Sequence, residues 1–151
     1  KEKFDVIIYS HVFEHILDLN NELNKIKKRL KKDGVLYIEV PGIYNLGLYK
    51  YDVSTFFQNA HTYNFSLNSL KNILNKNNFK LVYGDEKVVS IFKISNNQGF
   101  NIKNDYNNIR AFLNECEKRK KIWFLYPQGF KLLLIIIFKK LKIFDLIKKF
   151  I

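Results

Sequence analysis

The sequence predicts an α/β fold in which a strand–helix–strand unit is followed by an antiparallel hairpin and by C-terminal helices. Two short apolar runs, residues 4–9 and 35–40, flank a segment whose leucines and isoleucines recur at helical spacing. Strands joined through one helix are parallel neighbours, and a run without polar alternation is typical of a strand covered on both faces. Two later runs, residues 79–83 and 87–94, flank Gly84-Asp85-Glu86, which predicts a hairpin that adds an antiparallel edge to the sheet.

The first helix is predicted from one apolar face and from its end signals. Asp18 can cap its start, with Asn20 or Asn21 as alternatives, and Asp33-Gly34 is expected to end it. The following residues are expected to point inward: Leu17, Leu19, Leu23, Ile26 and Leu30.

A second helix is predicted from Ser66, its N-cap, to about Asn77. Residues 43–64 lie between this helix and the second strand and are rich in Tyr and Phe, which predicts a long aromatic loop. Loops of this length in a compact domain are usually functional or disordered.

The C-terminal third is predicted to be helical. Residues 95–104 are polar and rich in asparagine, so we expect a boundary there, with one domain over 1–95 and a helical extension over 96–151. A helix is expected over about 105–121, then a break over 123–129. A last helix over 128–151 is strongly apolar with interspersed lysines, and such a basic amphipathic helix can lie at a membrane surface or pack on a partner.

Composition and charge exclude several classes of protein. The net charge is +12, from 26 Lys and Arg against 14 Asp and Glu, and nearly all of the positive charge is lysine. Because lysine, asparagine and isoleucine are abundant throughout, biased composition accounts for this charge as easily as a nucleic-acid partner does. The charge is therefore discounted as evidence of function, and we expect no nucleic-acid partner. Cys116 is the only cysteine, which excludes an intramolecular disulfide or a multi-cysteine zinc site, and we expect an inert or surface thiol.

Location and completeness are also expectations from sequence. No apolar run reaches the roughly 20 residues that span a bilayer. The charged N-terminus lacks a signal-peptide core, so we expect a cytoplasmic protein, or a peripheral one at the inner face of the membrane. The chain begins at Lys1 and contains no methionine, so we expect it to be a fragment of a longer protein.

The polar stretch after the first strand is the main candidate site. Ser10, His11, Glu14 and His15 follow the carboxyl end of that strand, which is where ligands bind in open α/β sheets. His61 lies in the segment after the next strand, which should return to the same edge of the sheet. We therefore predict that His11, His15 and His61 meet at one rim, and we take these three histidines as the candidate catalytic residues.

The same residues resemble a known family. The run FDVIIYSHVFEHILD at residues 4–18, followed by LKKDGVLYIEVPG at 30–42, resembles the second half of a class I S-adenosylmethionine-dependent methyltransferase. In that family a strand ending in HVLEH precedes a helix, and an LKPGG turn leads into a strand ending in proline. The later run at 61–82 is similar to the family's H…FS…SL…LL…GF segment, with Asn78 in the place of the glycine. The resemblance covers roughly residues 2–94 and implies a partial Rossmann-like sheet.

The resemblance also implies a cofactor and a reaction. S-adenosylmethionine would transfer a methyl group to a small molecule or glycan precursor. Most of the cofactor site is expected upstream of residue 1, since no G-x-G cluster occurs here, so the chain alone should be inactive. Ser10 and His11 would flank the cofactor's methionine end, and Tyr44, Phe57 and Tyr63 would line the substrate. The alternative is an inactive methyltransferase-like module, held at a membrane or in a complex by its last helix.

Three roles remain open for the histidines. Where the acceptor is a hydroxyl, His61 or His11 could remove its proton, because imidazole titrates near neutral pH. We assign no metal ligand, although some relatives with Glu-x-x-Glu-His and a later histidine resemble metal-assisted methyltransferases. That alternative would use His11, Glu14, His15 and His61, a set suited to zinc or iron. In the third reading, Glu14 and His15 merely begin a helix.

Overall fold

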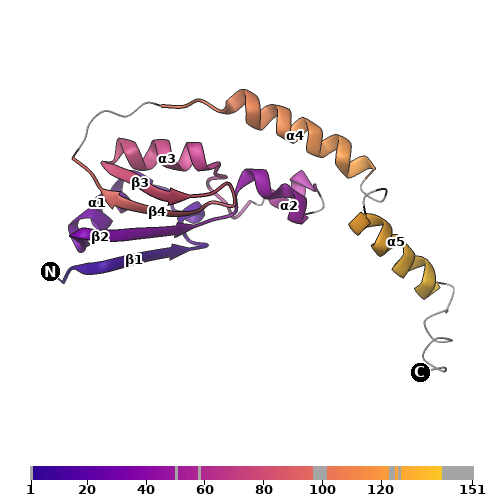
Figure 1. Ribbon diagram of the computed structural model, residues 1–151, viewed down its shortest axis with the longest axis horizontal. Coiled ribbons are helices and arrows are strands. Elements are labelled where there is room, and N and C mark those ends of the chain that lie inside the picture. Colours follow the sequence, from indigo (N-terminus) through magenta and orange to yellow (C-terminus); the bar gives the residue numbers. More distant parts are fainter. Residues whose placement is uncertain are drawn as a thin grey trace, which may run out of the picture.

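The computed structural model describes residues 2–49, 51–57, 59–96, 102–122, 125 and 127–140 (Figure 1). Its strands and helices, with two short 3-10 helices η1 and η2, follow in this order: β1 (Phe4–Ser10), η1 (Phe13–His15), α1 (Leu19–Arg29), β2 (Leu30–Glu39), η2 (Ile43–Tyr49), α2 (Val53–Phe56), α3 (Leu67–Lys76), β3 (Phe79–Gly84), β4 (Val89–Ile94), α4 (Tyr106–Lys121) and α5 (Pro127–Lys140).

The four strands form one sheet in the order β1-β2-β4-β3. β1 and β2 are parallel, with Ile7 opposite Leu36 and Tyr9 opposite Ile38. β4 pairs antiparallel with both β2 and β3. The prediction of a parallel pair extended by an antiparallel hairpin is therefore confirmed, and the carboxyl ends of β1 and β2 lie at a common edge.

Helices α1 and α3 contribute to one apolar core on one face of this sheet. α1 supplies Leu19, Leu23 and Ile26, and α3 supplies Leu70 and Leu74. They pack with buried side chains of the strands and of the segments that follow them: Phe13, Leu30, Leu36, Ile38, Val40, Phe65, Phe79, Val88 and Phe92. Burial of this layer is the main stabilisation of the sheet, since apolar area removed from water contributes about 25 cal/mol per Å².

The expectation that residues 4–9 form a strand covered on both faces is wrong. Val6 is 51% exposed and Ile8 is 65% exposed, while Ile7 and Tyr9 pack against the core. Successive side chains of a strand point to opposite faces, so the described residues cover only one face of β1. β1 is also an edge strand, as Figure 1 shows. Beside it lies a hollow of about 550 Å³, lined in part by Phe4, Tyr9 and Ile26.

The first helix begins later and ends earlier than its leucine pattern indicated. The Asp18 carboxylate accepts a hydrogen bond from the Asn21 backbone amide, which makes Asp18 the N-cap. Leu17 therefore precedes the helix and is 80% exposed, not inward-facing as expected. The helix ends at Arg29, and β2 starts at once with Leu30, before the predicted stop at Asp33-Gly34.

Residues 43–64 contain two short helices, η2 and α2, so they are not one irregular loop. A second apolar cluster explains why: Ile43, Leu46 and Phe56 are buried against Cys116 of α4. Cys116 is 1% exposed, so the alternative that this thiol lies at the surface is wrong. Burial raises the pKa of the thiol. The raised pKa keeps the thiol protonated, which agrees with the alternative that it is inert.

Helix α5 starts at Pro127, the first-turn position that proline favours, inside the break predicted for 123–129. The part of the predicted last helix beyond residue 140 lies outside the described residues. Within the described ranges, no helix combines the length and apolar character needed to cross a membrane.

Asn78 explains how α3 turns into β3. Its φ is 61°, in the left-handed region, and its amide donates to the Asn75 carbonyl at 3.0 Å. Glycine and asparagine favour this conformation just after a helix, because other side chains crowd the backbone there. Asparagine in place of the glycine of the family that the sequence resembles is therefore compatible with the left-handed backbone conformation at this position.

We predict that Asn78→Gly keeps or raises stability, whereas Asn78→Val lowers the free energy of unfolding by about 1–2 kcal/mol. Urea unfolding followed by circular dichroism measures both values. Lys76→Val is the control, because Lys76 is an exposed residue at the end of α3 and its φ is not positive. An equal loss for Val at 76 and 78 would contradict the left-handed constraint.

Asp52 joins α2 to α4. Its side chain accepts hydrogen bonds from Ser54 and Thr55 at the start of α2, and from Lys120 Nζ at 2.9 Å. The Ser54 hydroxyl first, and then Lys120, hold the pKa of the Asp52 carboxyl well below its ordinary value of 3.8. The carboxylate is thus bound more tightly in the folded chain than in the unfolded one.

A lowered pKa gives a contribution to stability that is present above the unfolded value and lost as the pH falls. We predict that Asp52 stabilises the contact between α2 and α4 at neutral pH and that this contribution fades below about pH 4. Asp52→Asn should therefore flatten the acid limb of a plot of unfolding free energy against pH. An acid limb identical to that of the unmodified chain would contradict this assignment.

Candidate functional site at the sheet rim

Hydrogen bonds join the carboxyl ends of β1 and β2. The His11 amide donates to the Glu39 carbonyl at 2.8 Å, and Ser10 Oγ donates to Glu39 Oε2 at 3.0 Å. Tyr37 donates to the same carboxylate oxygen at 3.3 Å. Ser10 and His11 are exposed at this edge, where the polypeptide leaves the sheet.

His11 turns the chain away from β1 with a φ of 53°. This left-handed conformation is uncommon for a residue other than glycine and is concentrated at functional sites, where the surrounding structure maintains it. The turn leads into η1, and it explains why residues 11–15 do not form one helix with both histidines on one face. The imidazoles of His11 and His15 nevertheless both lie close to the same carboxylate, that of Glu14.

The short helix η1 places a carboxylate inside the protein. Phe13 is fully buried and contacts the rings of Tyr9 and Phe65, at centroid distances of 5.8 and 6.1 Å. The next residue, Glu14, is drawn inward and is 2% exposed. Its Oε1 lies 3.7 Å from His11 Nδ1 and 3.8 Å from His15 Nε2, whereas Oε2 has no hydrogen-bond partner in the described structure.

The segment after α2 is tied to η1 through its backbone. The amides of Thr62 and Tyr63 both donate to the Glu14 carbonyl, at 2.9 and 3.1 Å. Tyr63 donates its hydroxyl to the Leu17 carbonyl, and the buried ring of Phe65 anchors the end of the segment in the core. These contacts bring His61 to the rim, although it is far from β1 in sequence.

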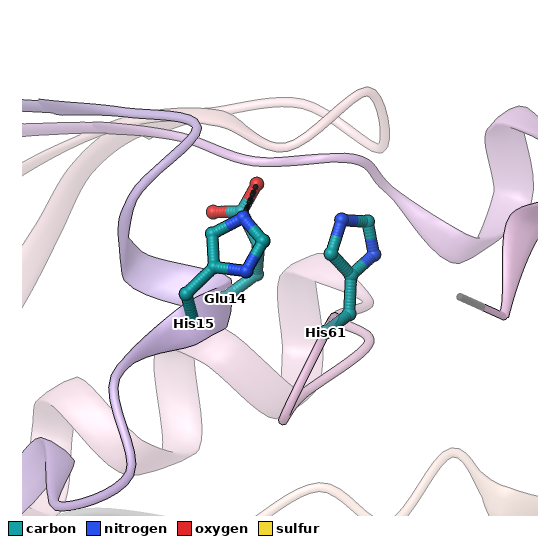
Figure 2. Close-up of side chains that lie close together, drawn as sticks. All are labelled: Glu14, His15 and His61. Carbon is teal, nitrogen blue, oxygen red and sulfur yellow. Dashed lines mark ion pairs between the residues drawn. The ribbon is translucent and has the colours of Figure 1, made fainter. Parts of the chain in front are cut away.

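Glu14, His15 and His61 form the centre of the site (Figure 2). One possible ligand atom from each lies within 4.8 Å of those of the other two, and the two imidazole rings meet edge to face at 4.9 Å. His15 Nδ1 lies 2.7 Å from the Ala60 carbonyl oxygen. Because a carbonyl only accepts, Nδ1 carries the proton, and in the neutral ring Nε2 is left as the free lone pair. Figure 2 shows His15 and His61 side by side near the carboxylate.

The structure thus brings two of the three predicted histidines together, with the third close by. His11 contacts the outer side of Glu14, and its side chain is 62% exposed. Glu14 is not among the three residues predicted to be catalytic. The available signal for its burial is its position directly after an aromatic residue and between two histidines.

The three residues predicted to line the substrate lie in two places. Tyr63 belongs to the rim segment, where its ring stacks on Phe65. Tyr44 packs edge to face on Phe112 of α4, and Phe57 packs on Phe56, so both belong to the second apolar cluster. These contacts account for the aromatic character of the segment by packing, and contact with substrate stays a prediction.

Comparison with known protein families identifies the kind of domain that contains this rim. A family model described as a methyltransferase domain matches residues 1–83, which include β1, β2, the rim and most of β3. The chain belongs to the methyltransferase domain family. Its partial Rossmann-like sheet is consistent with a methyltransferase domain of the class I type. No curated protein matches the chain.

Proposed function

We propose that the protein transfers a methyl group from S-adenosylmethionine to a small molecule or glycan precursor, and that His11 acts at the reacting end. One observation carries this proposal. In a methyltransferase domain, an exposed histidine is held in a left-handed backbone conformation at the carboxyl end of a parallel strand, with its ring facing a buried carboxylate.

The residues present fit one end of the cofactor. Ser10 and His11 are polar and exposed at the strand end, the edge where ligands of open α/β sheets bind, so they would hold the methionine portion. The cofactor would supply an electrophilic methyl group on sulfur. The remaining contacts would come from sequence upstream of residue 1, so the 151-residue chain alone should bind the cofactor weakly.

Transfer of a methyl group requires alignment of the acceptor and, for a hydroxyl acceptor, removal of its proton. His11 can accept that proton, and the Glu14 carboxylate 3.7 Å away would stabilise the imidazolium formed. The Glu14 carbonyl holds the segment carrying Tyr63, which would position the acceptor beside this histidine.

Calorimetry on the full-length gene product tests cofactor binding directly. We expect heat with S-adenosylmethionine and with its demethylated product, and absence of heat with both would refute the proposal.

His11→Gln should lower methyl transfer about 10²–10⁴-fold, because a proton acceptor is lost. Transfer of labelled methyl groups to a fractionated metabolite pool measures this, and undiminished transfer by His11→Gln would reject it as the base.

We also propose that α5 holds the protein at the cytoplasmic face of a membrane. This role does not require methyl transfer, so it would be equally compatible with an inactive methyltransferase-like module. Apolar side chains of this helix are exposed, among them Phe130 at 52%, Ile136 at 45% and Ile137 at 39%. Lys131 and Lys140 lie among and beside them, and four basic residues end α4. In Figure 1, α4 and α5 extend away from the sheet. Apolar side chains edged by lysines complement the surface of an anionic bilayer.

Deletion of residues 129–151 should abolish sedimentation of the protein with vesicles rich in phosphatidylglycerol. The lysines make an electrostatic contribution, so binding to neutral phosphatidylcholine vesicles should be weaker, and added salt should reduce binding. Unchanged sedimentation after the deletion would exclude α5 as the attachment.

A further inference from the structure

The buried carboxylate of Glu14 is incomplete as the chain alone presents it. The side chain is 98% buried, yet Oε2 has no hydrogen-bond partner among the described residues. The distances from Oε1 to His11 and His15, 3.7 and 3.8 Å, are too long for hydrogen bonds. An ionised carboxylate without partners is costly to bury, so this position calls for a positive charge.

The tautomer of His15 leads to the same conclusion. The Ala60 carbonyl fixes the proton on Nδ1, so the lone pair of a neutral imidazole is at Nε2. Nε2 is the atom that faces Glu14 Oε1. Two acceptors then face each other, which is unfavourable unless a cation lies between them. A backbone carbonyl behind a histidine is also the arrangement that orients histidine ligands of metals.

His61 supplies a third donor on a segment that can adjust. Its ring lies beside that of His15, and its nearest ligand atom is within 4.8 Å of those of Glu14 and His15. Ligands of a tetrahedral zinc ion lie about 3.4 Å apart, since each is about 2.1 Å from the metal. The distances between the ligand atoms, which are 4.8 Å or less, therefore need to shorten by at most about 1.4 Å. His61 can supply this movement, because it is only partly buried and follows the exposed residues 59–60.

We propose that Glu14, His15 and His61 bind one zinc-like divalent cation, which fixes the segment 59–65 to the end of β1. Two imidazoles and one carboxylate favour zinc or a neighbouring transition metal over magnesium, which prefers oxygen ligands. His11, on the outer side of Glu14, is not a ligand. The inference concerns the same rim as the proposed methyl transfer but rests only on these contacts.

The test uses the tag-free chain after chelator treatment, titrated with zinc chloride and, separately, with magnesium chloride. We expect one equivalent of zinc to bind, the melting temperature to rise, and magnesium to produce no comparable change. His15→Gln and His61→Gln should each weaken zinc binding by at least about tenfold. His11→Gln and Glu39→Gln are matched controls on the same rim and should leave zinc affinity within about threefold.

Glu14→Gln separates a lost ligand from a lost fold. The amide removes the buried charge and can donate to His15 Nε2, so in chelator this variant should melt at or above the temperature of the unmodified chain. In zinc it should show no rise in melting temperature. Equal zinc affinity in Glu14→Gln and the unmodified chain would overturn the proposal, as would loss of binding in His11→Gln but not in His61→Gln. Cofactor calorimetry on the full-length gene product would distinguish failure of this site from failure of methyl transfer.

Discussion

The burial of one carboxylate organises the functional end of this molecule. Phe13 enters the core between Tyr9 and Phe65, and the short helix that carries it takes Glu14 inside as well. The backbone carbonyl of Glu14 then receives the two amides that hold the distant segment containing His61. One apolar anchor therefore determines both where the acid lies and which histidines surround it. Burial of the apolar Phe13 ring stabilises this arrangement, and its electrostatic consequence is that a buried carboxylate lies beside histidine side chains.

Much of the fold could be predicted because local signals and tertiary packing agree. The apolar run of β2, the Ser66 cap and the hairpin turn each predicted an element that exists. The common rim of the two parallel strands could also be predicted, because strand direction fixes which ends meet. The buried state of Glu14 could not, since it follows from the long-range packing of its neighbour against Phe65.

The wrong expectations share a physical cause, which is that burial depends on what lies opposite a residue. Val6 and Ile8 have the character of core residues, yet the described chain places nothing over them. Cys116 has polar neighbours in sequence, yet it packs against the cluster formed by η2 and α2. Leu17 fits the helical pattern, but the cap at Asp18 excludes it from the helix. Periodicity reports which face is apolar and does not report whether that face has a partner.

Among the described residues, β1 pairs with a strand on one side alone, and its open side has a practical consequence for work with this chain. Exposed strand edges associate readily with other strands, which leads to aggregation when the partner is arbitrary. The other side of β1 is already fixed in register with β2, and the rim residues are held by contacts within the described chain. A separately produced polypeptide carrying a complementary strand could therefore complete the sheet without rebuilding the histidine cluster. The protein is thus a natural candidate for assembly from two independently expressed pieces, with solubility as the immediate sign that the pieces have joined.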